Sequence, residues 1–79
     1  MKVCVLYFAS LRDTAGHAEA EVETMAATPA ALYDELQARH GFGFARGRLR
    51  VAVDDAFVDW CTALREGCEV AFIPPVSGG

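Results

Sequence analysis

Apolar and polar residues alternate with different periods along the chain, and these periods predict short elements. Residues 2–8 are apolar at almost every position and rich in β-forming types. They predict a central strand that is covered on both faces, or covered on one face with the other used at an interface. Residues 17–23 alternate strictly, with Ala18, Ala20 and Val22 on one face and three glutamates on the other. This second segment predicts a strand with one solvated face, and an acidic docking patch for a basic partner is the alternative for Glu19, Glu21 and Glu23.

Two helices are predicted from the residues at their ends. The segment Ser10–Asp13 fits a capping box and Gly16 follows it as a stop, which predicts a helix of one or two turns. Thr28 and Pro29 predict the start of a longer helix, as N-cap and first helical residue. Apolar residues then recur at helical spacing until Gly41, where the longer helix is predicted to end.

Three further strands are predicted after the long helix. Residues 49–53 alternate, Asp54-Asp55 predicts a turn, and residues 57–60 predict a short return strand. Residues 68–73 predict a last strand, which ends at Pro74-Pro75 because proline donates no backbone hydrogen bond.

The order of these elements predicts the fold class. One long helix and one short helix against a mixed sheet of four to five strands is an α+β arrangement. The first and last strands both have central character, which suits a β-grasp sheet, where the two terminal strands lie side by side. We therefore expect one β-grasp domain over residues 1–74 and a flexible tail over residues 75–79.

Length and composition exclude several classes of function. With 79 residues and 53% hydrophobic positions, the chain can form one small ordered domain, and its surplus of apolar residues predicts a surface kept for a partner. The net charge of −4 argues against nucleic acid or an acidic membrane as partner. No apolar run approaches the roughly 20 residues of a membrane span. A chain this short also lacks room for a deep catalytic pocket.

The cysteines favour a reducing cytoplasm. Cys4, Cys61 and Cys68 are odd in number and lack CxxC spacing, which argues against a secreted disulfide scaffold. A signal peptide is not expected, because the N-terminal apolar run is short and soon interrupted. Together with His17 and His40, the cysteines show no metal-ligand spacing, so no metal site is predicted. Cys4 and Cys68 are expected to be packed thiols, and a reactive, exposed Cys61 stays open.

The C-terminal segment carries the candidate chemistry. Pro75–Gly79 can reach about 16 Å beyond the sheet. Gly78 and Gly79 have no side chains, so their backbone can enter a narrow channel. A terminal carboxylate is a poor acyl donor and needs activation, for which an acyl-adenylate is suited. An ordinary frayed terminus is the alternative.

The ending Phe72-Ile73-Pro74-Pro75-Val76-Ser77-Gly78-Gly79 resembles the terminal signature of the small, sulfur-carrying (MoaD-type) subunits of molybdopterin synthase. The resemblance covers essentially the whole chain. Residues 5–12 are similar to the family's first strand and helix, residues 28–32 to the start of its main helix, and residues 64–72 to its final hairpin.

The resemblance implies a ubiquitin-like fold and a sulfur-carrier role. A ubiquitin-activating-type enzyme would use ATP to adenylate the Gly79 carboxylate, and a sulfur donor protein would convert it to a thiocarboxylate. The tail, positioned by Pro75, Val76, Ser77 and Gly78, would enter the large catalytic subunit. There it would donate sulfur to cyclic pyranopterin monophosphate. This chain would be a non-catalytic subunit of a heterotetramer, with no cofactor or metal bound.

Aromatic and aliphatic side chains together with one arginine are candidates for the partner surface: Phe8, Arg12, Phe57, Phe72 and Ile73. The resemblance directs Phe57, Ile73 and Val76 toward the large subunit, and Arg12 is the candidate to pair with it. Aromatic anchors with an arginine match the composition of binding hot spots. For the four apolar candidates Phe8, Phe57, Phe72 and Ile73, an ordinary core position is the alternative.

Three other functions stay open from the sequence. The first is a sulfur carrier of another pathway, such as thiamine synthesis or tRNA thiolation, against which the Pro-Pro-Val-Ser-Gly-Gly ending argues. The second is a ubiquitin-like modifier whose tail is conjugated to lysines, which the chemical state of the tail in cells distinguishes. The third is a non-covalent binding module, which would tolerate loss of Gly79.

Overall fold

The computed structural model describes residues 1–75 as a five-stranded sheet with two α-helices. The elements in chain order are β1 (Lys2–Tyr7), α1 (Ala9–Ala15), β2 (Glu19–Glu23), α2 (Pro29–His40), a 3₁₀ turn (Arg46–Arg48), β3 (Arg50–Val53), β4 (Ala56–Val58) and β5 (Glu69–Ile73). The strand order is β2-β1-β5-β3-β4. β1 and β5 are parallel neighbours, and the other pairs are antiparallel. This order confirms the predicted mixed β-grasp sheet with terminal strands side by side.

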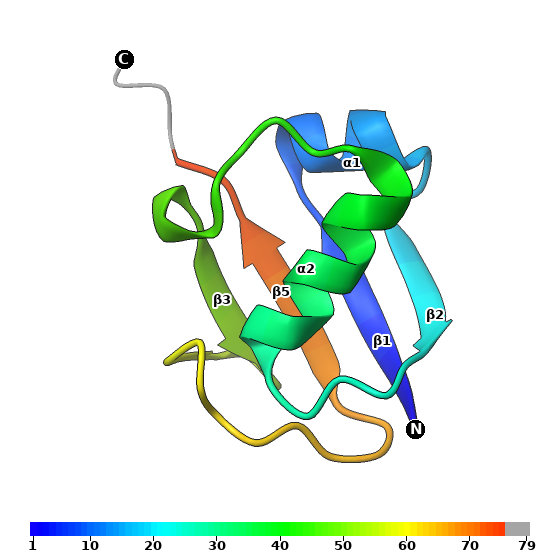
Figure 1. Cartoon of the computed structure of the whole chain (residues 1–79), viewed down its shortest axis with the longest axis vertical. Helices are drawn as coiled ribbons and strands as arrows, with labels where there is room; N and C mark the ends of the chain where they lie inside the picture. The colour runs from blue at the N-terminus through cyan, green and yellow to red at the C-terminus, as the bar shows by residue number, and fades with distance from the viewer. Residues whose placement is uncertain (76–79) are drawn as a thin grey trace.

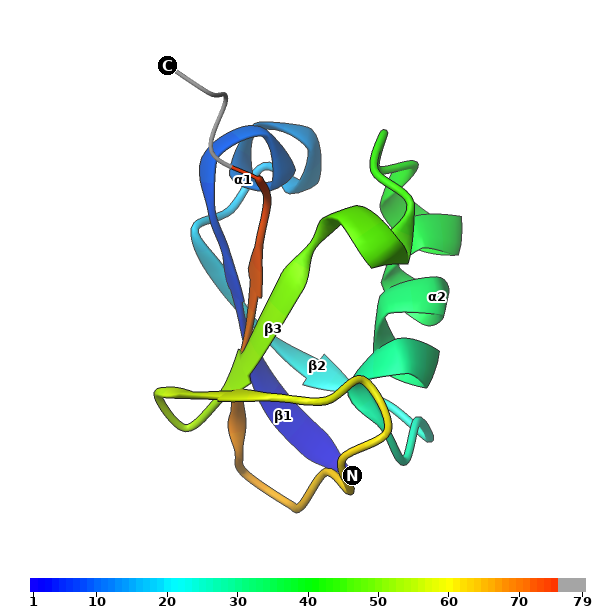
Figure 2. The same ribbon diagram turned by 90° about the vertical axis from the view of Figure 1, so that its left-hand side faces the viewer.

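Helix α2 lies across one face of the sheet, and the core fills the space between them (Figure 1). Figure 2 shows this layering from the side, with α1 at the end of the sheet where β5 finishes. Every second strand residue points to α2, because successive side chains of a strand alternate between its faces. The buried side chains of this layer include Val3, Val5, Tyr7, Leu32, Tyr33, Leu36, Val51, Val70 and Phe72.

The two helices differ in how well their ends were predicted. In α2, the Thr28 hydroxyl accepts a hydrogen bond from the Ala31 amide at 3.2 Å, and Gly41 ends the helix with φ 73°. Both assignments are confirmed. In α1, Gly16 also ends the helix as predicted, with φ 85°.

The predicted capping box of α1 is wrong. The helix begins at Ala9, one residue before the box, and its N-cap Phe8 makes no side-chain hydrogen bond. The chain turns sharply out of β1 at Ala9, which has φ 49°. The helix therefore begins directly after this change of chain direction, and Leu11 in its first turn is buried in the core.

The loop after α2 is tied to that helix by hydrogen bonds. The Tyr33 hydroxyl donates to the Phe44 carbonyl at 2.7 Å, and the Gln37 amide donates to the Phe42 and Phe44 carbonyls at 3.1 and 3.2 Å. Burial, and then the nearby Asp34 charge, raise the pKa of the Tyr33 hydroxyl, which keeps it protonated as a donor. Phe44 is therefore held at a fixed place near the end of β5.

Burial separates two phenylalanines that look alike in sequence, and this difference is measurable. Phe72→Ala should lower the free energy of unfolding by about 3–5 kcal/mol, because it removes a ring with no exposed surface. Phe57→Ala should cost about 1 kcal/mol or less, because its ring is 62% exposed. Urea unfolding of both variants measures the difference, and equal losses would contradict this assignment of the core.

Candidate functional site

The sheet face opposite α2 carries a continuous row of apolar side chains. The register pairs Leu6 of β1 with Ala71 of β5, Ala71 with Ala52 of β3, and Ala52 with Phe57 of β4. Paired residues on neighbouring strands point to the same face of a sheet. These four side chains therefore form one row across four strands, on the side away from the core.

This row widens into an apolar surface at the end of β5. Phe57 is 62% exposed, Phe8 is 44% exposed and Ile73 is half-buried. A shallow hollow brings these three side chains together with the rest of the row, and Asp55 and Glu69 also line it. Exposed apolar surfaces of this kind mark interaction sites. We call this surface the docking face, and it consists of Leu6, Phe8, Ala52, Phe57, Ala71 and Ile73.

The docking face adjoins the point where the chain leaves the sheet. β5 ends at Ile73, and the next residues are the half-buried Pro74 and the exposed Pro75. A second hollow is lined by Phe8, Phe44, Ile73 and both prolines, among other residues. Figure 1 shows the chain leaving β5 at the same end of the sheet as α1. We call Pro74 and Pro75 the tail root.

The structure places the predicted partner-binding residues in different surroundings. Phe8, Phe57 and Ile73 come together on the docking face. Arg12 is exposed on α1, at the tail-root end of the sheet, and its role stays a prediction. Pro75 is exposed at the tail root. The other tail residues, Val76, Ser77, Gly78 and Gly79, lie outside the described residues.

Phe72 requires a correction, because the structure buries it completely. Its ring centroid lies 5.3 Å from that of Tyr33 and 6.0 Å from that of Trp60, on the α2 side of the sheet. Strand alternation explains the difference from Ile73, its neighbour, which points to the opposite face. The expectation that Phe72 contacts a partner is therefore wrong, and Phe72 is a core residue.

Two of the three thiols lie where the sequence predicts packed cysteines. Cys68 is buried and Cys4 is half-buried, whereas Cys61 is exposed. Burial and then the Glu19 charge raise the pKa of the Cys4 thiol, which disfavours its nucleophilic thiolate form. Among residues 1–75, no three His, Cys, Asp or Glu side chains group as a metal site would require.

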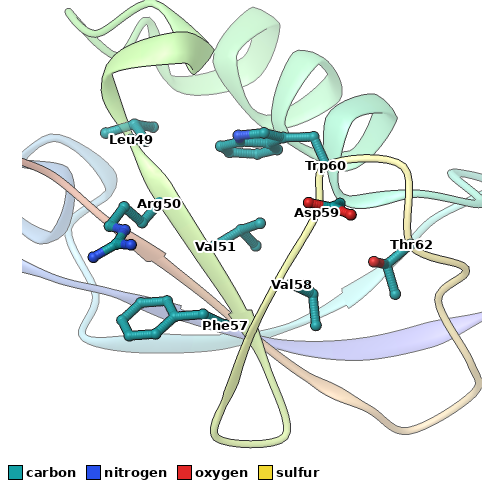
Figure 3. A pocket seen from close by; sticks show the side chains of 8 residues that line it. All are labelled: Leu49, Arg50, Val51, Phe57, Val58, Asp59, Trp60 and Thr62. Carbon is teal, nitrogen blue, oxygen red and sulfur yellow. The ribbon is translucent and has the colours of Figure 1, made fainter.

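A third hollow, beside the docking face, was not expected from the sequence (Figure 3). It opens where the β3–β4 pairing stops at Val51 and Val58. At the edge of this hollow, the Arg50 guanidinium lies over the Phe57 ring, 4.7 Å from the ring centroid. Of the three closely spaced arginines Arg46, Arg48 and Arg50, only Arg50 lines this hollow, so their spacing in the sequence does not predict it.

The fold and the docking face define a ubiquitin-like β-grasp protein. The sequence matches the model of the ThiS family over residues 5–79. The chain therefore belongs to the ThiS family. Among residues 1–75, neither helix has the length and apolar character needed to cross a bilayer.

Close relatives share one description. The molybdopterin synthase sulfur carrier subunit of Escherichia coli is 37% identical over 78 residues, which cover 95% of this chain and 96% of the relative. The molybdopterin synthase sulfur carrier subunit of Mycobacterium tuberculosis is 37% identical over 82 residues, which cover 100% of this chain and 99% of the relative.

Solved structures extend the similarity. SAMP1 from Haloferax volcanii has a TM-score of 0.82 at 27% identity, over 100% of both chains. Subunit 1 of a molybdopterin converting factor from Pyrococcus furiosus has a TM-score of 0.78 at 32% identity, over 96% of this chain and 99% of that chain. A chain in the complex of subunits 1 and 2 of the molybdopterin-converting factor from Helicobacter pylori has a TM-score of 0.71 at 26% identity, over 100% of both chains.

The different surroundings of the thiols predict a difference in alkylation. At pH 8, iodoacetamide should modify exposed Cys61 first and Cys4 much more slowly. Because burial raises the pKa of Cys4 above that of an ordinary thiol, its thiolate fraction and its alkylation rate should keep rising at a pH where those of an ordinary thiol have levelled off. Peptide mass spectrometry over time measures both rates. Labelling of Cys4 as fast as Cys61 at pH 8 would contradict the assignment.

Proposed function

We propose that this chain is the sulfur-carrier subunit of a molybdopterin synthase. In this role the Gly79 carboxyl group is adenylated, converted to a thiocarboxylate and used to donate sulfur to cyclic pyranopterin monophosphate during molybdenum cofactor synthesis. The observation that carries the proposal is the continuity of the docking face with the tail root. The family match, which runs through residue 79, and the shared description of the relatives support it.

The order of the chemical steps follows from the properties of a carboxylate. Attack of a Gly79 carboxylate oxygen on the α-phosphorus of ATP forms an acyl-adenylate and releases pyrophosphate. A donor protein then supplies sulfur at the oxidation level of sulfide. This sulfur attacks the same carbonyl carbon and displaces AMP, and loss of its proton leaves a thiocarboxylate. Its sulfur is a far better nucleophile than a carboxylate oxygen. ATP is therefore a substrate of the activating enzyme, and this chain needs no resident cofactor.

The large catalytic subunit supplies what this small domain lacks. A shallow apolar face can orient the chain, but it offers no enclosed site that would exclude water from a reacting group. Docking would fix the tail root against the partner and thereby confine the Gly79 carbonyl carbon near the substrate. The Helicobacter pylori complex, in which a similar chain occurs with a second subunit, supports this partner. The heterotetramer remains part of the proposal.

A ubiquitin-like modifier is the second candidate, and its support is the similarity to SAMP1, the small archaeal modifier protein 1 of Haloferax volcanii. Both functions begin with adenylation of a terminal glycine, so the docking face and the tail root suit either. They differ in the acceptor, because a modifier ends in an isopeptide bond to lysine. The relatives with higher sequence identity favour the sulfur carrier.

The docking face predicts a specific binding defect. Phe57→Ala should weaken binding of the large subunit by about 1–3 kcal/mol, because it removes an exposed aromatic anchor. Met25→Ala is the matched control, since Met25 is 97% exposed and lies in the loop between β2 and α2, at the other end of the sheet from the tail root. Calorimetric titration measures both affinities. Unchanged affinity of the Phe57 variant would remove this ring from the interface.

The position of the reacting carbon predicts a strict length requirement. Deleting Gly79 moves the terminal carbonyl back by about 3.5 Å, and a misplacement of about 1 Å can already cost about 100-fold in rate. Molybdopterin formation should therefore be lost in the truncated chain, while binding of the large subunit persists. Gly78→Val should also fail through its bulk and restricted backbone.

Cys61→Ser is the control for this experiment, because it removes the exposed thiol and leaves the tail intact. Reconstitution with the activating enzyme, ATP, a sulfur source and the large subunit measures product from each variant. Full activity of the truncated chain, or loss of activity in the Cys61 variant with folding and binding retained, would refute transfer from Gly79.

A further inference from the structure

Charge is distributed unequally across the open face of the sheet. The register pairs Glu19 with Leu6, Glu21 with Cys4 and Glu23 with Lys2. These glutamates therefore lie on the same face as the docking face and make its β2 edge acidic. Two of them have cationic neighbours: Glu21 lies 3.8 Å from the Lys2 amine, and Glu23 lies 3.0 Å from the N-terminal amine.

Arg50 places a positive charge near the opposite edge, where Asp55 and Glu69 also line the hollow beside Phe57 and Asp59 lines the hollow beside Arg50. Its Cα is in register with Ile73, the last residue of β5, so Arg50 lies beside the point where the chain turns into the tail root. Its guanidinium is 4.7 Å from the Phe57 ring centroid (Figure 3). Stacking on an aromatic face orients a guanidinium and leaves its N–H edge available to a further partner.

Three arginines approach aromatic rings, and Arg50 is the nearest of them to its ring. Arg48 lies 5.9 Å from the centroid of Phe44 and, like Arg50, is in none of the ion pairs of residues 1–75. Arg46 also approaches a ring, that of Trp60, but its guanidinium already lies 3.6 Å from the Asp34 carboxylate. Within residues 1–75, the ion pairs involve the N-terminal amine, Lys2 and Arg46, and none involves Arg50. Arg50 thus presents an oriented cation at the rim of an exposed apolar surface.

We propose that Arg50 is a specificity-determining residue of the docking face, where it binds a carboxylate of the large subunit. This inference rests on the proposed function. A planar guanidinium matches a carboxylate with two parallel hydrogen bonds, so the contact selects direction as well as charge. A partner docked the other way round would bring its carboxylate to Glu19 and the acidic β2 edge, where like charges repel.

This contact would control delivery of the tail. Because Arg50 and Ile73 are register partners, fixing Arg50 against the large subunit also fixes the direction in which Pro74 leaves the sheet. The apolar side chains of the docking face make no directional contacts of their own. Arg50 therefore supplies orientation, while Phe57 and its apolar neighbours supply buried area.

Charge reversal at Arg50 tests the proposal in the intact chain. Association with the large subunit is measured by surface plasmon resonance at low and high salt for Arg50→Glu, Arg50→Lys and Arg65→Glu. Arg65→Glu is the matched control, because it makes the same change of charge as Arg50→Glu at a distant site. Arg65 is exposed in the turn before β5, at the end of that strand away from the tail root. Thermal melts show whether each variant retains the fold.

Arg50→Glu should weaken binding by about tenfold or more at low salt, with a slower association rate and a smaller difference at high salt. Arg50→Lys should lose less affinity than Arg50→Glu, because lysine keeps the positive charge but not the forked geometry of a guanidinium. Replacement of one acidic residue of the large subunit by lysine should restore binding of Arg50→Glu. Arg65→Glu should stay within about threefold of the unmodified chain, because surface charges far from an interface contribute little.

The proposal is overturned if Arg50→Glu binds as well as Arg65→Glu. Phe57→Ala in the same assay separates this result from failure of the proposed function. Weaker binding by the Phe57 variant alone would reject the role of Arg50 and leave the docking face standing. Full binding by both the Phe57 and the Arg50 variant would reject the docking face itself.

Discussion

The parallel pairing of β1 with β5 at the centre of the sheet determines where the docking face meets the tail root. Cys4 to Tyr7 are in register with Glu69 to Phe72, so the first and last strands of the domain are hydrogen-bonded neighbours. Parallel strands need a long connection, and here the rest of the domain supplies it. The pairing brings Phe8 beside Ile73 and thereby joins the docking face to the tail root.

Strand alternation divides the work between the two faces of the sheet. Val70 and Phe72 point to α2 and are fully buried, whereas Ala71 and Ile73, between and after them, point to the open face. The same short strand therefore stabilises the core and contributes to the docking face. A partner that binds the open face does not need to disturb the core. This explains how so small a domain can keep an exposed apolar surface and still fold.

Elements with local signals were predictable from the sequence. Thr28, Pro29 and Gly41 fixed the ends of α2 because capping depends on neighbouring residues only. The start of α1 depends instead on how the chain leaves β1, and the sequence prediction missed it. The residue type could not show that Phe72 is buried and Phe57 exposed, because both are phenylalanines in predicted strands that are rich in apolar residues. Contact between Arg50 and Phe57 depends on the pairing of β3 with β4, which no local pattern specifies.

The central claim of this account is that the domain carries sulfur on its terminal carboxyl group. The most direct test is the intact mass of the chain purified from cells that are making molybdenum cofactor, together with the masses of its C-terminal fragments. The account predicts a population heavier by the difference between a sulfur and an oxygen atom, with the added mass confined to the fragment that contains Gly79. Added mass on a cysteine, or a Gly79 joined only to lysine side chains of other proteins, would contradict it.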